Sequence, residues 1–200
     1  MSQSKDDTHD EQHVERILGH LSYFLTKNPD QKQQLDFEIL LLAICWHDTW
    51  KSTRNPNTLM TFLFDNYWDG YGSYFTFLKE SKNSGVNPKT RKRVAYAIRK
   101  HGFAEPFPRR TNEAKLLKDI DVLEKWNIER FDKTRKEWFS EPGTKGRLLM
   151  LKFAKKIFYD SQRDNHFYHK WFEQEYNKRK KTAIDFLNKT INDYSDYCNK

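Results

Sequence analysis

The chain has 200 residues, of which 36% are hydrophobic and 32% charged, and its formal net charge is +8 at pH 7. This length suits one domain, and no apolar run is long enough for a transmembrane helix. Its two cysteines, Cys45 and Cys198, are far apart, which excludes a dense disulfide framework and favours a cytoplasmic protein. A basic protein attracts phosphate-bearing substrates and nucleic acids alike, and a general enrichment in lysine would give the same charge without any partner.

The first part of the chain predicts two helices. Residues 1–8 are polar, contain no hydrophobic signal segment and are expected to be flexible, which leaves residues 9–195 as the domain. Apolar residues at three- and four-residue steps predict a helix over residues 10–27. A second helix is predicted over residues 33–50 and is apolar nearly all round in its last half, so we expect it to be the most buried helix.

The middle of the chain alternates helices with glycine- and proline-containing breaks. The aromatic stretch 58–80 has two glycines within residues 69–72, where we predict a flexible turn between two short helices. Pro88 suits the first turn of a helix that ends at Gly102. Thr111 suits the N-cap of the helix that follows.

Further helices are predicted over residues 129–139, 145–160 and 167–194, and no segment shows the sustained alternation of a strand. The predicted fold is therefore all-α, a single compact bundle of seven to nine helices. The sequence leaves the oligomeric state open.

The pair His47-Asp48 at the end of the apolar helix is the strongest candidate for a functional site. An imidazole and a carboxylate are rarely buried unless something pairs them, and a divalent ion would pair both. Neighbouring helical residues point about 100° apart, so both reach one ion only if it lies off the helix end or between their directions. The competing interpretation is a capping aspartate beside a partly buried histidine.

Two other pairs of residues extend this candidate site. His9 and His13 are four residues apart and share one helix face, so both can bind an ion, or one can bind it while the other contacts substrate. Near a chain end they could equally be two exposed histidines. Asp119 and Asp121 face different sides of their helix, so only one should meet the ion. A shell of histidine and carboxylate suits Mn, Fe, Ni, Co or Zn ions, and Mg remains a candidate.

Taken in order, His13, the pair His47-Asp48 and Asp121 resemble the metal ligands of the HD superfamily of metal-dependent phosphohydrolases. Residues 119–123 resemble the Asp-x-Asp-x-Leu segment of its small predicted phosphohydrolase branch. The resemblance implies an all-α HD-type domain that binds one or two divalent ions, with these four residues as ligands and Asp48 able to bridge a second ion.

The resemblance extends over residues 9–190 and includes the closing helices, but it has one departure. The branch usually carries an Asn-Glu dipeptide a short way after the His-Asp pair, whereas here Asn57 is followed by Thr58. This substitution puts the substrate, and with it the activity, in question.

The resemblance also gives His101 a place in the cleft, where it completes a second metal site or contacts phosphate. The competing interpretation is a histidine favoured by the helix dipole. His9 is kept as an outer substrate contact. Lys51 and Arg54 directly follow the metal pair and are predicted to hold a phosphate, for which Arg offers a planar fork.

A metal ion in such a site activates water and polarises a phosphoryl oxygen. The predicted function is hydrolysis of a phosphoester, a monoester or a diester, in a nucleotide or another small phosphorylated substrate. Asp48 and His101 are the predicted catalytic residues. The alternative is a non-catalytic, metal-stabilised protein that binds a nucleotide or a nucleic acid through its basic surface.

Overall fold

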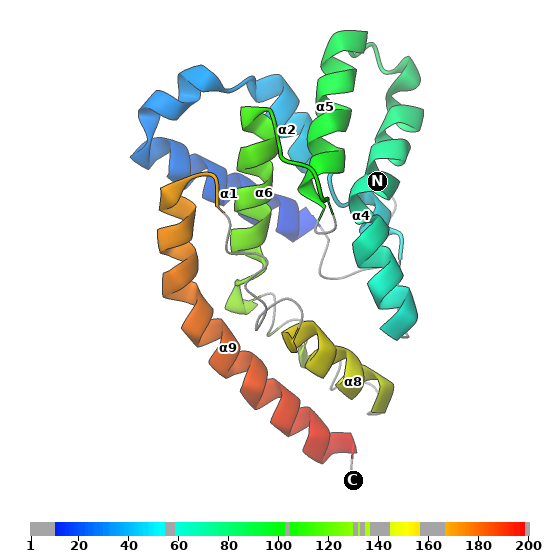
Figure 1. The fold of residues 1–200 in the computed structure, drawn as a ribbon, viewed down its shortest axis with the longest axis vertical. Coiled ribbons are helices and arrows are strands. Elements are labelled where there is room, and N and C mark those ends of the chain that lie inside the picture. Colours follow the sequence, from blue (N-terminus) through cyan, green and yellow to red (C-terminus); the bar gives the residue numbers. More distant parts are fainter. Residues whose placement is uncertain are drawn as a thin grey trace. The chain divides into compact units, whose positions relative to one another are not determined.

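The computed structural model describes residues 11–54, 59–102, 105–129, 132, 135–136, 145–156 and 167–198. Within these ranges every regular element is helical, which confirms the all-α prediction, and eight α-helices agree with the predicted seven to nine. None of the described helices combines the length and the apolarity needed to cross a lipid bilayer. The helices are α1 (Glu11–Lys27), α2 (Phe37–Trp46), α3 (Thr49–Ser52), α4 (Leu59–Glu80), α5 (Pro88–His101), α6 (Asn112–Glu124), α8 (Lys145–Ala154) and α9 (Lys170–Cys198), drawn in Figure 1.

The chain divides into two compact units. One consists of Met1–Asn55 and Phe64–Asp121, and the other of Pro56–Leu63 and Val122–Lys200. The first unit holds the helices that carry the candidate site, and in it α2 packs mainly against α5. In the second unit α8 packs on α9, around the buried side chains of Leu151, Leu187, Ile191 and Tyr194. The predicted domain boundaries at residues 9 and 195 stay a prediction.

The prediction of one helix over residues 33–50 is wrong, although the prediction for residues 10–27 is confirmed by α1. A short 3-10 helix over Pro29–Gln34 precedes α2. Asp36 then begins α2, because its side chain accepts a hydrogen bond from the Ile39 N–H, as an N-cap residue does. The helix ends at Trp46, and α3 starts after Asp48.

The most buried helix is α6 rather than α2. Leu41 on α2 is 41% exposed, whereas residues 116–124 of α6 are all buried. The apolar residues in the second half of α2 therefore do not make it the most buried of the described helices. Helix α6 is more buried, although it carries charged side chains. Thr111 caps α6 as predicted, since its hydroxyl accepts a hydrogen bond from the Ala114 N–H.

Helix α4 runs without a break through Gly70 and Gly72, so the predicted turn at residues 69–72 is wrong. These glycines allow close packing. A Cβ on Gly70 would lie 2.5 Å from the carbonyl oxygen of Arg99 on α5, and a Cβ on Gly72 would overlap the Trp50 ring. The absence of a side chain, rather than a special backbone conformation, is what both positions require.

Helices α5 and α9 agree with their predictions, whereas two other predicted helices are only partly described by the structure. Helix α5 begins at Pro88 and Gly102 follows its last residue, as predicted. Helix α9 begins at Lys170 and agrees with the prediction for residues 167–194. The predicted helix over residues 129–139 lies largely outside the described residues, as does the end of the one predicted over residues 145–160.

Candidate metal centre

His47 and Asp48 lie at a break between two helices, which allows adjacent side chains to face one point. His47 closes α2 with helical backbone angles, and Asp48 leaves the helix with φ −105° and ψ 14° before α3 begins. The backbone N–H of Trp50 in α3 donates to the Ser73 hydroxyl on α4. The side chains of His47 and Asp48 meet off the end of α2, one of the two arrangements expected from the sequence.

A first group of buried ligands forms around this pair. His13 on α1 brings its Nε2 atom to 3.2 Å from His47 Nε2 and to 3.1 Å from Asp48 Oδ2. His47 Nε2 is 3.2 Å from the same Asp48 oxygen. Asp121 Oδ1 on α6 is 3.9 Å from both Nε2 atoms. The ligand set expected from the sequence, His13, His47, Asp48 and Asp121, is thus assembled from three separate segments.

These spacings fit a metal ion. Ligand atoms about 2.1 Å from a common ion lie about 3.0 Å apart when they are octahedral neighbours and about 4.2 Å apart when they are opposite. The ligand atoms of the first group all lie within 4.8 Å of one another. The mixture of imidazole nitrogen and carboxylate oxygen suits a divalent transition metal, although it does not select one.

The protonation of His47 also suits a ligand. Its Nδ1 atom is 2.7 Å from the Ile44 carbonyl oxygen, which can only accept a hydrogen bond, so Nδ1 carries the proton. In the neutral ring Nε2 then presents its lone pair toward His13 and the carboxylates. The last turn of α2 therefore fixes the tautomer that a metal ion requires.

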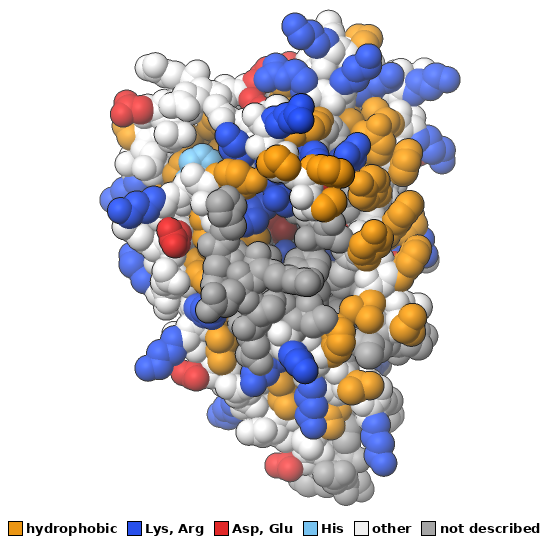
Figure 2. All heavy atoms as spheres, in the orientation of Figure 1, with side chains coloured by type: hydrophobic (Ala, Val, Ile, Leu, Met, Phe, Trp, Pro, Cys, Tyr) orange, Lys and Arg blue, Asp and Glu red, His pale blue; other side chains and the backbone are white. Residues whose placement is uncertain are grey.

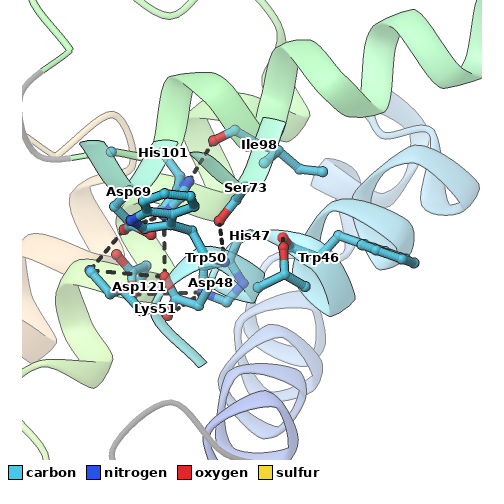
Figure 3. Close-up of polar contacts among 12 residues, drawn as sticks. Trp46, His47, Asp48, Trp50, Lys51, Asp69, Ser73, Ile98, His101 and Asp121 are labelled. Atoms are coloured by element: carbon cyan, nitrogen blue, oxygen red, sulfur yellow. Dashed lines mark hydrogen bonds and ion pairs between the residues drawn. The ribbon is translucent and has the colours of Figure 1, made fainter. Parts of the chain in front are cut away.

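A second group of buried residues, Asp48, Asp69 and His101, shares Asp48 with the first and could also hold a metal ion. His101 Nε2 lies 3.1 Å from Asp69 Oδ2 and 3.4 Å from Asp48 Oδ1. His101 Nδ1 donates to the Ile98 carbonyl. Figure 3 shows these side chains gathered from α4, α5 and the α2–α3 junction.

Lys51 also belongs to this second group. Its Nζ atom lies 2.7 Å from Asp69 Oδ2 and 4.0 Å from Asp48 Oδ1. Burial by itself would lower the pKa of Lys51, but the charges of Asp69, Asp48 and Asp121 outweigh it and raise that pKa. Lys51 is therefore an ammonium ion at neutral pH.

The same carboxylates act on His101. Burial by itself would lower the pKa of His101, whereas Asp69 and Asp48 raise it to about 10. In the metal-free protein His101 is thus an imidazolium at neutral pH, and its Nε2–H donates to Asp69. His101 therefore lies between two carboxylates, of which Asp48 also belongs to the first group.

Sequence reasoning missed Asp69, because the glycines beside it were interpreted as a turn. A signal was available, since Asp65, Asp69 and Ser73 follow one another at four-residue steps in an aromatic segment. All three side chains are buried in α4. Such a polar stripe on an apolar helix indicates an inward polar face.

Other predicted site residues are not brought into these two groups. Arg54 stacks on the Trp50 ring at 4.0 Å, and its Nε atom is 4.0 Å from Asp65; its phosphate role stays a prediction. Asp119, the other aspartate of the pair, is fully buried and is therefore not a solvated surface charge. His9 and Thr58 lie outside the described residues, and the outer contact expected of His9 stays a prediction.

No protein-family model matches the sequence, and neither the curated proteins nor the solved structures that were searched include a match.

Proposed function

We propose that this protein is a metal-dependent phosphohydrolase of the HD type that acts on a nucleotide or another small phosphate ester. The observation that carries the proposal is the buried first group, in which four ligands in HD order converge from α1, the α2–α3 junction and α6 with spacings that fit a metal ion. The resemblance of the sequence to the HD superfamily supports the same reaction class.

A divalent ion in the first group would supply a nucleophilic water at neutral pH and a positive charge for a phosphoryl oxygen. The other roles fall to the chain itself. His13, His47, Asp48 and Asp121 would hold the ion, and the carbonyl of Ile44 keeps His47 in the ligating tautomer. Asp48 belongs to both groups, and its Oδ1 atom lies 3.4 Å from His101 Nε2.

His101 and Lys51 complete the proposed reaction. The ammonium of Lys51 attracts the phosphate oxygens, since it is charged and next to Asp48. The imidazolium of His101 gives its Nε2 proton to the leaving oxygen as the ester bond breaks, and water restores that proton afterwards. Asp69 keeps both cations in position through its Oδ2 atom.

A substrate panel tests the proposal directly. Nucleoside monophosphates, triphosphates, cyclic nucleotides and short oligonucleotides are incubated with Mn²⁺, and the products are separated by chromatography. We expect turnover of at least one small substrate and its loss by about 10³-fold in Asp48→Ala, because the ion's contribution is several kcal/mol. Asp65→Asn, which changes another buried carboxylate outside both groups, should keep the activity. Equal rates for wild type and Asp48→Ala on every substrate would remove the hydrolase proposal.

A second candidate, a nucleic-acid-binding protein without turnover, is favoured by one surface. Figure 2 shows hydrophobic side chains gathered over α4, and the exposed ones include Phe64, Tyr67 and Phe75. Helix α5 carries basic side chains and no acidic residue. Exposed aromatic rings beside cations can stack on bases. Tight binding of single-stranded DNA or RNA that weakens steeply with salt, with no metal-dependent turnover, would favour this candidate.

A further inference from the structure

The second group of buried residues already contains a cation of the chain. Asp69 and His101, together with the shared Asp48, could take a second metal ion, which would make the centre dinuclear. The ammonium of Lys51 lies against the same Asp69 oxygen that His101 contacts. We infer that Lys51 takes the place of a second metal ion, so that the centre holds one divalent ion and one ammonium. This inference rests on the proposed metal centre.

The distances leave little room for both cations. Lys51 Nζ is 2.7 Å from Asp69 Oδ2, and a metal ion bound to that oxygen would lie about 2.1 Å from it. The two cations would then be at most about 4.8 Å apart, even on opposite sides of the oxygen. Like charges at such a distance in a buried site repel strongly, since little water is present to screen them.

The second group already contains positive charge supplied by the chain. Asp48, Asp69 and Asp121 are buried, and Lys51 lies against the first two of these carboxylates. Buried charges are tolerated when they are compensated. Lys51 compensates Asp69, and a second divalent ion beside it would add two more positive charges.

Lys51 is also held in place rather than free to leave for solvent. It lies on α3, three residues after Asp48, and its side chain is 14% exposed, against 3% for the side chain of its partner Asp69. Arg54 also follows the His47-Asp48 pair in the sequence, but its side chain is 44% exposed. Of these two cations, Lys51 is thus the one built into the centre.

Replacing Lys51 with an uncharged residue should allow a second metal ion to bind to the second group. Asp69 Oδ1 is buried and has no hydrogen-bond partner among the described residues, so an incoming ion would find an oxygen there besides Oδ2. Lys51→Met keeps the length of the side chain and removes its charge. We expect this variant to bind a second ion through Asp48, Asp69 and His101.

The experiment measures Mn²⁺ per chain in the full-length protein by equilibrium dialysis and records the electron paramagnetic resonance spectrum. We expect wild type to bind one ion with an uncoupled spectrum. Lys51→Met should bind two, with the exchange coupling of ions about 3.5–4 Å apart. Lys51→Met/Asp69→Asn should return to one ion, because the second position loses its carboxylate.

The matched control is Lys100→Met. Lys100 is a buried lysine with its Nζ 2.6 Å from Glu105 Oε1, outside both groups, so this variant should bind one ion. Two ions in wild type, or one ion in Lys51→Met, would overturn the inference and leave the proposed metal centre intact. No ion in any variant would overturn both. If Lys51→Met fails to fold, Lys51→Gln replaces it. The number of Mn²⁺ ions per wild-type chain and the wild-type spectrum then still test the inference.

Discussion

The two ligand groups share Asp48 and differ in how their buried negative charge is compensated. In the first group two histidines and two carboxylates face one another at ligand spacing, and at His47 the fixed tautomer leaves a lone pair for an ion. In the second group Lys51 and an imidazolium already contact the carboxylates. Similar residue types therefore do not make equivalent sites. What distinguishes them is whether the chain itself supplies the cation.

The largest expected effect is a difference between His13 of the first group and His101 of the second. His13→Ala removes a direct ligand and should weaken Mn²⁺ binding by more than about 100-fold, because changes to residues that only support ligands already cost 10–100-fold. His101→Ala should keep the ion and lose about 10²–10⁴-fold in activity, as expected for a proton donor. Calorimetric titration with Mn²⁺ and initial rates measure both. Loss of the ion in His101→Ala would make His101 a ligand and reduce the difference between the groups.

A pH dependence of stability should come from the second group. Because the folded protein raises the pKa of His101 to about 10, the protonated form stabilises the fold. This contribution is fully present below about pH 6.5, the ordinary value for histidine, and is lost as the pH rises through about 10. Urea unfolding of the metal-free protein should therefore show a loss of stability over that range. His101→Gln should lack this component, and parallel curves for the two proteins would contradict the assignment.

The smallest expected effect concerns the contact between α4 and α5 at Gly70, next to Asp69 of the second group. Gly70→Ala adds a Cβ 2.5 Å from the Arg99 carbonyl oxygen and should destabilise the protein by about 1–3 kcal/mol, as overpacking does. Gly19→Ala on α1 is the matched control, because its Cβ would meet nothing within 4 Å. In a helix this change should stabilise by roughly 0.5–1 kcal/mol. Thermal unfolding compares them, and equal shifts would show that the contact at Gly70 can relax.

The first group could be predicted from the sequence because its residues are chemically distinctive and occur in a recognisable order. His13, His47, Asp48 and Asp121 needed no knowledge of packing to be selected, and the all-α fold followed from periodicity. The exact end of α2 could not be predicted, since residues 47–50 contain no glycine or proline to mark the point where the chain leaves the helix at Asp48. Local sequence does not show where tertiary contacts end a helix.

The second group was only half predicted, and the reason lies in α4. A glycine in a turn and a glycine at a close helix crossing look the same in one sequence, and only the position of Arg99 on another helix distinguishes them. Asp69 was therefore assigned to a loop. Lys51 was predicted to hold a phosphate, but its contact with Asp69 depends on the same helix crossing.

That crossing has a consequence for how the protein can vary in evolution. Gly70 and Gly102 face each other where α4 meets the end of α5, and they directly follow Asp69 and His101 in the sequence. A larger residue at either position would separate the two backbones and, with them, the Asp69–His101 contact. In homologous chains we therefore expect residue size at positions 70 and 102 to covary with the identity of residues 69 and 101.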